Sequence, residues 1–367
     1  MTLVSNPGQL MNLSRLTGNP PQSIGTVLAV VPCLNEAEYI DRVVNGLLAE
    51  AGDLDLGIVV VDGGSRDGTR EAVEQIAERD SRVVLLDNPR GIQSAALNEA
   101  VRRFGQGVRF LIRIDAHAEY PPDYCARLVS TQIATAADSV VVAMRTKGET
   151  CFQRAAAVAQ NSLLGNGGAS HRSGRRGGWV EHGHHALMTL TAFCAVGGYD
   201  ESFSHNEDAE LDVRLREAGF RIFLTGEAPV VYYPRRSVSA LFLQYFNIGR
   251  GRARNFMKHR NGAKLRHLVL VVVAPTLLLL FLAPFASIFA FPALAWGALC
   301  IGYGLLLGIR SYDPCAMASG LAAMTTQAGW SFGFLAQLAL TAAQHCGAWL
   351  RLDESRGGRD RRDQTAS

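Results

Sequence analysis

The stretch from Leu268 to Ile309 contains no charged residue, and no other feature of the sequence limits the possible folds as strongly. A membrane span needs only about 20 apolar residues, so this stretch is too long for a single helix. Pro284 and Pro292 lie near its middle, where a turn between two helices would fall. We therefore expect a transmembrane helical hairpin over 268–309, with a buried helix of a soluble domain as the alternative.

A basic run comes directly before this apolar stretch. No Asp or Glu occurs from Ala228 to Tyr312, and the run contains Arg250, Arg252, Arg254, Lys258, Arg260, Lys264 and Arg266. Basic residues that flank a membrane span lie on its cytoplasmic side. We expect a basic amphipathic juxtamembrane segment over 237–267. We place the protein at the inner (cytoplasmic) membrane, with the preceding part of the chain facing the cytoplasm.

The remaining terminal segments are less apolar. Cys315 to Ala343 carries Gln327 and Gln337, and a full span here would place the arginine-rich tail outside the cytoplasm. We therefore expect a third membrane or interfacial helix over 315–343. We expect the polar tail, 351–367, to be disordered. The polar N-terminal extension, 1–25, lacks the apolar centre of a signal peptide.

Composition excludes several whole-chain classes. Hydrophobic residues make up 48% and charged residues 19%, which excludes a disordered chain or a coiled coil. The net charge of +3 is too small to indicate nucleic acid as a partner. The seven cysteines are widely spaced and contain no CxxC pair, so we expect buried thiols rather than a disulfide framework or a structural zinc site.

From Thr26 to about Arg236, short valine-rich runs alternate with amphipathic helical patterns. The expected strands are Val27 to Pro32, Gly57 to Asp62, Val83 to Asp87, Phe110 to Asp115 and Val140 to Met144. The expected helices are Glu36 to Glu50, Thr69 to Arg79 and Gln93 to Phe104. This alternation predicts a Rossmann-like α/β fold with a mostly parallel sheet, in which ligands bind at the carboxyl ends of the strands.

Two of these strands end in distinctive turns. The first runs into Pro32 to Glu36, a Pro-Cys-Leu-Asn-Glu sequence, and the second ends in Asp62 followed by Gly63 and Gly64. An acidic side chain at a strand end can accept hydrogen bonds from a base or ribose, and glycines let a ligand approach the backbone closely. Either turn alone is equally typical of an ordinary strand-to-helix connection. Together they indicate a nucleotide pocket.

The two turns resemble those of the family 2 inverting glycosyltransferases of the GT-A fold. That family carries Pro-x-x-Asn-Glu and Val-Asp-Asp-Gly-Ser-x-Asp-Gly-Thr, and here Gly63 replaces the second Asp. The resemblance continues through Asn88 to Gly91 and Ala95 to Asn98, and it covers roughly Val27 to Arg260. It implies a GT-A nucleotide-sugar-binding catalytic domain over 26–236.

Within that family, three further segments resemble the succinoglycan-type exopolysaccharide biosynthesis glycosyltransferases. They are Ile114 to Ala118, Gly197 to Glu201 and Asn206 to Leu211. The resemblance implies that the donor nucleotide is bound by Pro32, Asn35, Glu36, Asp62, Gly64, Gly91, Asn98 and Asp115.

The resemblance also implies a metal site. Asp115 and His117 stand where the family has an Asp-x-Asp motif that holds a divalent cation against the donor diphosphate. The cation, Mn²⁺ or Mg²⁺, neutralises the charge that the leaving diphosphate gains, and a histidine ligand favours Mn²⁺. The alternative is that Asp115 caps a turn and His117 is a surface residue.

A pair of acids begins the last helical pattern of this region. The family assigns the general base to the Asp of its Glu-Asp pair, which here is Asp208, and Glu207 would orient the acceptor or the base. The alternative, that both acids stabilise a helix N-terminus, is compatible with that role. His182, His184 and His185 are expected to line the acceptor pocket, with a zinc site as the less favoured alternative.

Arg250 and Arg252 occupy the place of the Gln-x-x-Arg-Trp motif of processive members, which the sequence does not match. We expect them to contact the donor diphosphate or, as an equal alternative, anionic membrane lipids.

We therefore expect an inverting, metal-dependent hexosyltransferase. It would move a hexose from a nucleotide-sugar donor, UDP-glucose or a similar UDP-hexose, to a lipid-linked saccharide acceptor in exopolysaccharide biosynthesis. Its other partners would be membrane lipids, with no nucleic acid. One rival is a polyprenyl-phosphate sugar synthase, and the other is a noncatalytic membrane scaffold, which the substitutions at Gly63 and His117 motivate.

Overall fold

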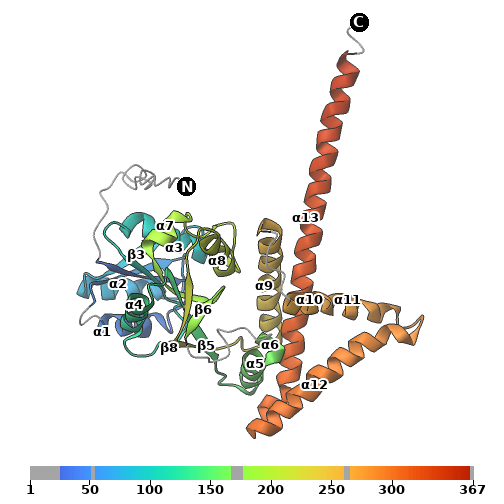
Figure 1. Ribbon diagram of the computed structural model, residues 1–367, viewed down its shortest axis with the longest axis horizontal. Coiled ribbons are helices and arrows are strands. Elements are labelled where there is room, and N and C mark those ends of the chain that lie inside the picture. Colours follow the sequence, from blue (N-terminus) through green and yellow to red (C-terminus); the bar gives the residue numbers. More distant parts are fainter. Residues whose placement is uncertain (1–24, 51–53, 167–176, 260–264, 364–367) are drawn as a thin grey trace, which may run out of the picture. The chain divides into compact units, whose positions relative to one another are not determined.

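The computed structural model describes residues 25–50, 54–166, 177–259 and 265–363 (Figure 1). Most of the expected N-terminal extension, 1–25, therefore lies outside the described residues. The chain divides into two compact units. The first comprises the chain up to Thr146 together with Gly168–Tyr232, and the second comprises Lys147–Gly167 and the chain from Tyr233 onward.

The first unit is built on an eight-stranded mixed sheet in the order β3-β2-β1-β4-β7-β5-β8-β6. Its strands are β1 (Val27–Cys33), β2 (Leu56–Asp62), β3 (Val83–Asp87), β4 (Phe110–Arg113), β5 (Ser139–Thr146), β6 (Gly178–Val180), β7 (His184–Thr189) and β8 (Ile222–Tyr232). Strands β3, β2, β1 and β4 run parallel, as do β5 and β8. Strand β7 is antiparallel to both of its neighbours, and β6 is antiparallel to β8. The expected α/β fold with a mostly parallel sheet is confirmed.

Helices cover both faces of this sheet (Figure 1). They are α1 (Ile40–Ala49), α2 (Thr69–Arg79), α3 (Gln93–Phe104), α4 (Tyr124–Thr135), α7 (Leu190–Ala195) and α8 (Glu207–Glu217). Successive residues of β1 face opposite sides: Ala29 packs in a core with α1, α2 and α4, whereas Val30 packs in a core with α3, α7 and α8. Burial on both faces explains why the strands read as continuous valine runs.

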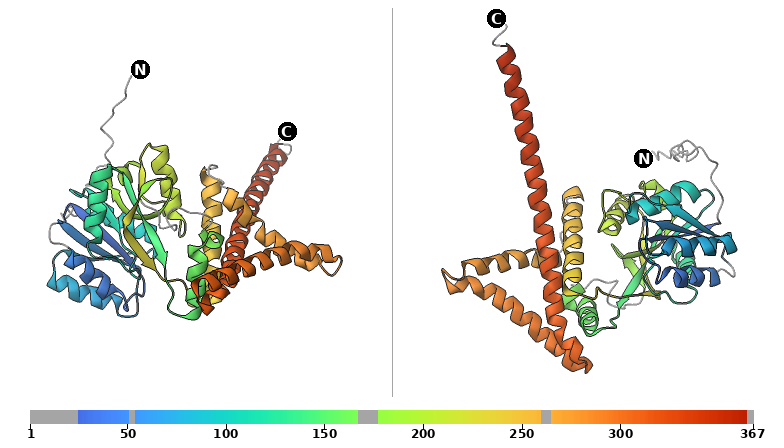
Figure 2. Two further views of the ribbon diagram at one scale, coloured as in Figure 1. Left: turned by 60° about the horizontal axis from the view of Figure 1, so that its bottom comes forward. Right: turned by 180° about the vertical axis from the view of Figure 1, so that it is seen from behind.

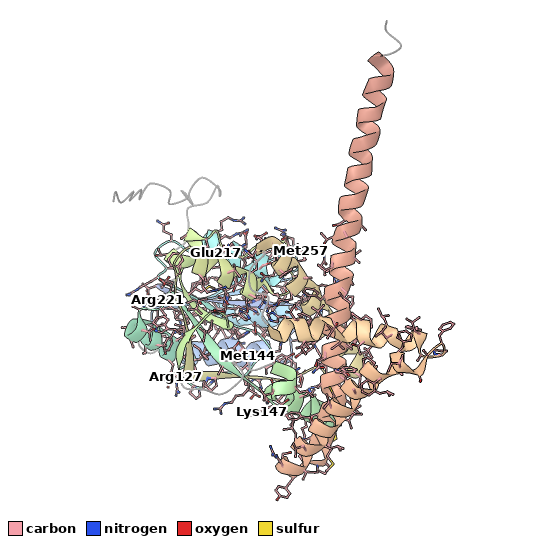
Figure 3. All side chains as sticks on the ribbon, turned by 45° about the vertical axis from the view of Figure 1, so that its right-hand side comes forward. Arg127, Met144, Lys147, Glu217, Arg221 and Met257 are labelled. Carbon is pink, nitrogen blue, oxygen red and sulfur yellow. A yellow bond between two sulfur atoms is a disulfide. The ribbon has the colours of Figure 1, made fainter. Side chains whose placement is uncertain are left out.

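Strand β6 forms the edge of the sheet and is held there by ring contacts. The ring of Trp179 meets that of Phe223 on β8 edge to face, with centroids 5.2 Å apart. The guanidinium of Arg221 lies over the Trp179 ring at 4.4 Å from its centroid, and Figure 3 labels this arginine. Such a cation–π contact stabilises a short strand that has few backbone bonds of its own.

The second unit is helical. It contains α5 (Cys151–Asn161), α6 (Leu163–Asn166), α9 (Val238–His259), α10 (Leu265–Val271), α11 (Val273–Leu278), α12 (Phe291–Ser311) and α13 (Ser319–Asp363), with 3-10 turns η3 (Leu279–Leu282), η4 (Ser287–Ala290) and η5 (Pro314–Ala318). The sequence predicted one continuous domain over 26–236, but α5 and α6 pack within this second unit.

The apolar stretch folds into two arms that meet at a tip (Figure 2). One arm, Ser287–Ser311, is long and apolar enough to cross a membrane, whereas the other, His267–Leu282, is shorter. Large side chains at the tip are exposed, among them Phe281 and Phe285. Helix α13 begins at Ser319, inside the expected third helix over 315–343, and continues to Asp363, so it includes most of the tail that we expected to be disordered.

Helix α9 packs closely against α13. A Cβ at Gly249 would lie 2.0 Å from the carbonyl oxygen of Trp330, and one at Gly333 would lie 1.9 Å from that of Phe246. Glycine therefore permits the close approach of the two helix backbones. This packing, rather than helix propensity, accounts for the order of the long α13 in the region that contacts α9.

A disulfide joins α5 to η5, contrary to our expectation for the cysteines. Cys151 and Cys315 are bonded, with their Cα atoms 5.1 Å apart. They are 164 residues apart in the sequence, so spacing gave no sign of the pairing. Among the other described cysteines, Cys33, Cys125 and Cys300 are buried as expected and Cys194 is exposed.

Candidate active site

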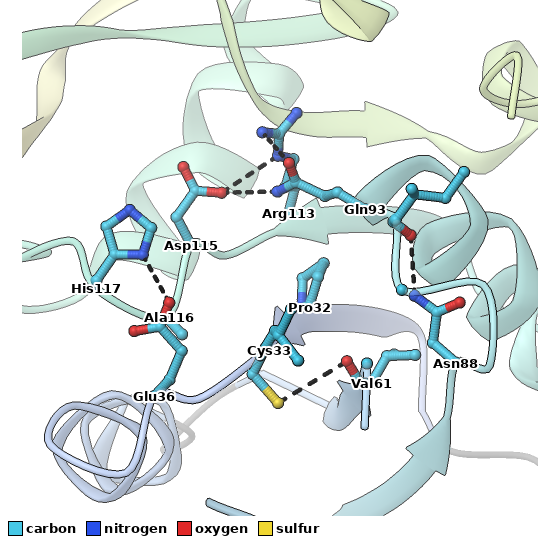
Figure 4. Close-up of a pocket in the computed structure, with 14 residues that line it drawn as sticks. Pro32, Cys33, Glu36, Val61, Asn88, Gln93, Arg113, Asp115, Ala116 and His117 are labelled. Atoms are coloured by element: carbon cyan, nitrogen blue, oxygen red, sulfur yellow. Dashed lines mark hydrogen bonds and ion pairs between the residues drawn. The ribbon is translucent and has the colours of Figure 1, made fainter. Parts of the chain in front are cut away.

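A cleft of about 290 Å³ opens at the carboxyl ends of β1, β2 and β4 (Figure 4). It is lined by Pro32, Cys33, Leu34, Glu36, Val61, Gly63, Asn88, Gly91, Ile92, Gln93, Arg113, Asp115, Ala116 and His117. This is the edge at which an open α/β sheet binds ligands. Four of the residues expected to bind the donor, namely Pro32, Glu36, Gly91 and Asp115, line it.

The two strand-end turns are tied to each other beside this cleft. Asn35 adopts a positive φ of 57°, its backbone N–H donates to Ser65 Oγ at 2.8 Å, and its Oδ1 accepts from the Arg66 N–H at 2.9 Å. The Glu36 N–H donates to Thr69 Oγ1 at 2.8 Å. The two motifs that the sequence joined by resemblance thus form one hydrogen-bonded structure.

Asp62 is buried and is held within its own turn. Its carboxylate accepts from Ser65 Oγ at 2.5 Å and from the Ser65 and Gly64 N–H groups. Gly64 has φ of 95°, a conformation that favours glycine. Gly63, rather than Asp62, lines the cleft. Contact of Asp62 or Gly64 with a nucleotide stays a prediction.

The thiol of Cys33 also lines the cleft. Burial and the nearby Asp62 raise the pKa of this thiol to about 12, and its Sγ donates to the Val61 carbonyl oxygen at 3.8 Å. Because the thiolate is the nucleophilic form, this cysteine is not a nucleophile at neutral pH.

Asp115 follows β4 and is the most heavily bonded carboxylate of the cleft (Figure 4). Its Oδ1 accepts from Gln93 Nε2 at 2.9 Å and from Arg113 Nε at 3.4 Å, and its Oδ2 lies 3.3 Å from His184 Nε2. Burial raises the pKa of Asp115, but the charges of Arg113 and His184 outweigh it and hold that pKa below its usual range. The carboxylate is therefore ionised.

His117 lies on the same wall of the cleft, with its Nδ1 3.0 Å from Glu36 Oε1. Over the described ranges, no group of three His, Cys, Asp or Glu side chains is arranged to hold a metal ion. An ionised carboxylate and an imidazole are side chains that Mn²⁺ accepts as ligands, so Asp115 and His117 fit the expected metal in kind. Their binding of a metal stays a prediction.

Arg113 connects the cleft to a second group of acids, and the sequence gave no role to it. Its side chain is 6% exposed and contacts Asp115, Gln93 Oε1 at 3.0 Å, Glu207 Oε1 at 3.5 Å and Asp208 Oδ1. Burial lowers its pKa, but the charges of Asp208 and Asp115 outweigh burial and raise it well above the ordinary value. A buried charge of this kind is stable only while its partners remain.

Asn206, which precedes α8, has φ of 61°, and Glu207 and Asp208 begin the first turn of the helix. Burial and the charge of Asp208 raise the pKa of Glu207 to about 7. Burial also raises the pKa of Asp208, but Arg113 and His185 outweigh it and lower that pKa. Two adjacent carboxyl groups whose pKa values are pushed apart are typical of an acid–base site.

The histidines lie on the other side of Asp208. His185 is fully buried, with Nε2 2.8 Å from Asp212 Oδ1 and Nδ1 2.7 Å from the Tyr199 hydroxyl. His182 Nδ1 lies 2.7 Å from Asp212 Oδ2. We expected the histidines to line an acceptor pocket, but His185 belongs to a buried hydrogen-bonded network. Arg113 and Asp212 were missed because nothing in their local sequence separates them from ordinary strand and helix residues. Tyr199 lies in the segment from Gly197 to Glu201 that carries the resemblance, but no role was given to it.

Asn98 lies with this acidic group rather than in the cleft. Its Nδ2 donates to the Tyr199 carbonyl oxygen at 2.8 Å, and its Oδ1 accepts from the Tyr199 N–H at 2.9 Å. Gly198 has φ of 70°, and a Cβ there would lie 2.5 Å from Asn98 Oδ1. The side-chain amide therefore fixes the turn that carries Tyr199, and its expected contact with the donor stays a prediction.

Arg250 and Arg252 lie on α9 of the second unit. Arg250 Nε donates to Gln337 Oε1 at 3.3 Å. Their contact with a diphosphate or with anionic lipid stays a prediction.

Known proteins share much of this sequence and of this fold. Residues 28–193 match the model of the family described as glycosyl transferase family 2. The chain is 52% identical over 311 residues to the succinoglycan biosynthesis protein ExoA of Rhizobium meliloti (strain 1021), an alignment that covers 85% of this chain and 94% of the relative. It is 34% identical over 116 residues to an undecaprenyl-phosphate 4-deoxy-4-formamido-L-arabinose transferase of Pseudomonas aeruginosa, covering 30% of this chain and 33% of that relative.

Among solved structures, the chain is similar to the mannosyltransferase PcManGT of Pyrobaculum calidifontis, solved in complex with GDP-Man and Mn²⁺. The TM-score is 0.55 at 19% identity, and the match covers 89% of this chain and 92% of that one. This likeness shows the GT-A fold.

Proposed function

The chain belongs to glycosyl transferase family 2, and from this membership we propose that it is an inverting enzyme that moves a hexose from a nucleotide sugar to a lipid-linked saccharide. The donor would be UDP-glucose or a related UDP-hexose. The name of the Rhizobium relative supports a role in succinoglycan or a similar exopolysaccharide, because that relative matches nearly all of its own length.

One observation carries the proposal. Arg113 lines the cleft and at the same time contacts Asp208, so the donor position and the candidate base are joined by a single buried side chain. In an inverting transfer the acceptor oxygen must attack the anomeric carbon from the face opposite the leaving diphosphate. A candidate base that contacts a residue lining the cleft lies near the donor position, which supports this role for Asp208.

The cleft residues would bind and orient the donor. Asp115 and His117 would hold a divalent cation, which when bound neutralises charge on the departing diphosphate. Gly63 and Gly91 leave backbone exposed for close approach of the nucleotide. Gln93 keeps Asp115 oriented by donating to its Oδ1.

Asp208 would take the proton of the acceptor hydroxyl as that oxygen attacks. Its lowered pKa keeps it ionised, and so able to accept a proton, across the physiological range. Glu207, with a pKa of about 7, is partly protonated at neutral pH and can donate a hydrogen bond to the acceptor. The two acids thus take different roles because their surroundings differ.

The acceptor would be lipid-linked and reached from the membrane surface. The helix Ser287–Ser311 and the basic run before the apolar stretch support an inner-membrane protein whose catalytic unit faces the cytoplasm. Membrane lipids are then partners as well. A shared membrane surface raises the effective concentration of a lipid-linked acceptor.

The test of the base is Asp208→Asn in the full-length protein. We expect transfer to fall by about 10² or more while the donor Kd stays unchanged, because only the proton acceptor is lost. Asp41→Asn, an exposed position on α1, is the matched control and should transfer normally. Near-wild-type turnover of Asp208→Asn would remove this residue from the role.

The partial match to the arabinose transferase suggests a second candidate function, a polyprenyl-phosphate sugar synthase. The chemical nature of the product distinguishes the two functions. A sugar phosphodiester and an extended diphosphate-linked oligosaccharide differ in their lability to mild acid. We expect the radiolabelled sugar to remain on the oligosaccharide that mild acid releases from the lipid. Release of the free labelled sugar alone would favour the phosphate acceptor.

A further inference from the structure

We propose that Tyr120 is a positioning residue for the donor cleft, because its hydroxyl holds the turn that carries Asp115 and His117. Tyr120 does not line the cleft itself, so it would act through these two residues rather than by touching the donor. The inference rests on the proposed function, since it takes Asp115 and His117 as the side chains that face the donor diphosphate.

The backbone of Asp115 lies just beyond the pairing of β4 with β1. The Ile114 N–H still donates to the Val30 carbonyl oxygen on β1, at 2.9 Å. The Asp115 N–H instead donates to the Tyr120 hydroxyl oxygen at 2.6 Å, and that hydroxyl donates to the Asp115 carbonyl oxygen at 3.1 Å. One side chain therefore serves both backbone groups of the first residue beyond the strand pairing.

This turn brings both predicted metal ligands to the cleft wall (Figure 4). The Ala118 N–H also donates to the Asp115 carbonyl oxygen, at 3.2 Å, and closes the turn on its other side. Asp115 and His117 are two residues apart, and both line the cleft. Because small displacements of orienting groups weaken binding and slow chemistry, a change in this one turn would move both side chains together.

The Tyr120 hydroxyl has a fixed position because residues outside the cleft lining anchor this part of the chain. The Tyr120 ring packs against the ring of Tyr124 on α4, with centroids 4.6 Å apart, and Tyr124 is buried. The preceding residue, Glu119, exchanges two backbone hydrogen bonds with Val231 on β8, at 3.2 and 3.0 Å. The turn at the cleft is thus attached through Tyr120 to the core beneath α4.

Removing the hydroxyl alone separates positioning from packing. Tyr120→Phe keeps the ring on Tyr124, but it takes away the acceptor of the Asp115 N–H and one of the two donors to its carbonyl oxygen. Tyr124→Phe is the matched control, because it removes a hydroxyl from the stacked ring and leaves both bonds between Tyr120 and Asp115 in place.

The first measurement is the binding of UDP to the full-length protein, by calorimetry over a range of Mn²⁺ concentrations. We expect Tyr120→Phe to weaken UDP binding about 10-fold at saturating Mn²⁺, and to raise the Mn²⁺ concentration for half-maximal binding about 10-fold. Tyr124→Phe should change neither quantity. A role of Tyr120 in stability alone would leave the Mn²⁺ dependence of the folded protein unchanged.

The second measurement is hydrogen exchange without nucleotide, read residue by residue over 113–120. In the natural protein the Asp115 N–H should exchange as slowly as the N–H groups of β4, and in Tyr120→Phe about 10-fold faster or more. Tyr124→Phe should exchange at the natural rate. Circular dichroism establishes that each variant is folded. Fast exchange of the Asp115 N–H in the natural protein would overturn the proposal without any variant.

The outcomes distinguish this inference from the proposed function. A folded Tyr120→Phe with unchanged UDP affinity and Mn²⁺ dependence would overturn the positioning role alone. If the natural protein binds UDP equally well in excess chelator, the metal role of Asp115 and His117 fails, and the UDP affinity of Tyr120→Phe decides the positioning role. If the natural protein does not bind UDP, the proposed donor fails, and hydrogen exchange decides it.

Discussion

The donor cleft and the acidic group at the start of α8 belong to the same unit but are constructed differently. The cleft is formed by turns at the ends of strands, which bond internally, as Asp62 does with Ser65, and to each other, as Glu36 does with Thr69. The acidic group is formed by side chains from β4, β7, the turn after α7 and α8, with Arg113 and His185 buried among them. Among the described residues, Arg113 and His184 each contact both groups.

This difference in construction fits the different tasks proposed for the two halves, donor binding and proton acceptance. A donor site has to admit and release a large anion, so glycines and backbone groups at an open edge serve it well. A proton acceptor instead needs a fixed pKa, which requires buried charges at set distances. Single substitutions should therefore affect one half without the other, except where the two halves meet.

The largest effect is expected where the halves meet. Arg113→Met should lower transfer by about 10³ and reduce the free energy of unfolding by about 3–5 kcal/mol, because it leaves Asp208 and Asp115 buried without their cation. Initial rates and urea unfolding measure the two losses. Arg113→Lys should recover most stability but little transfer, since one ammonium cannot span the same partners. Arg79→Met, on the exposed face of α2, is the control.

The donor half alone should depend on metal. Excess chelator should abolish donor binding in calorimetry, and Mn²⁺ should restore it at least as well as Mg²⁺. His117→Ala should weaken donor binding by about 10²-fold in Mn²⁺ and remove the preference for Mn²⁺ over Mg²⁺, because an imidazole ligand is lost. Full donor binding in chelator would count against the site. Unchanged metal preference in the variant would exclude His117 as a ligand.

Asn98 was predicted to bind the donor, but its side chain bonds to the Tyr199 backbone beside the acidic group. Asn98→Ala removes two hydrogen bonds to the Tyr199 backbone, so we expect kcat to fall about 10-fold and the free energy of unfolding to fall by about 1–3 kcal/mol. Donor affinity should not change. A weaker donor Kd with normal kcat would instead return this residue to the nucleotide site.

The smallest effect concerns Glu207. Burial and Asp208 raise its pKa from 4.5 to about 7, so folding favours its protonated form. The unfolded state therefore loses its proton first, and this group weakens the fold as pH rises from 4.5 through about 7. Glu207→Gln should be more stable than the natural protein above pH 7, with the difference gone below pH 4.5. Thermal unfolding across this pH range measures it, and an equal difference at every pH would contradict the shift.

The sequence predicted best the helices and strands whose patterns depend only on neighbouring residues. The helices over Thr69–Arg79 and Gln93–Phe104 and the strand over Val83–Asp87 have the expected bounds, because their periodicity is local. The helix expected from Glu36 begins at Ile40, since the preceding residues are used in the turn that bonds to Thr69.

Strands β6, β7 and β8 were not predicted. Strands β6 and β7 are short and pair antiparallel, β8 pairs parallel with β5, and all three gain their order from partners elsewhere in the chain. The same reason applies within the site. Arg113 is 95 residues from Asp208, and His185 is 27 from Asp212, so only the folded sheet reveals that they are partners. The disulfide between Cys151 and Cys315 was hidden in the same way.

The path of the chain through Lys147–Gly167 determines how the protein can be divided. The chain leaves the first unit after Thr146, returns at Gly168 and leaves again after Tyr232, so a single cut cannot separate the units. A protein shortened after α9 would keep α5 but lose α13, and Ala155 and Ala159 would lose the Ala322 and Ala323 neighbours of their cluster. A soluble catalytic fragment would therefore need a short linker in place of 147–167, and a gene fusion or domain exchange in this family would need two junctions in place of one.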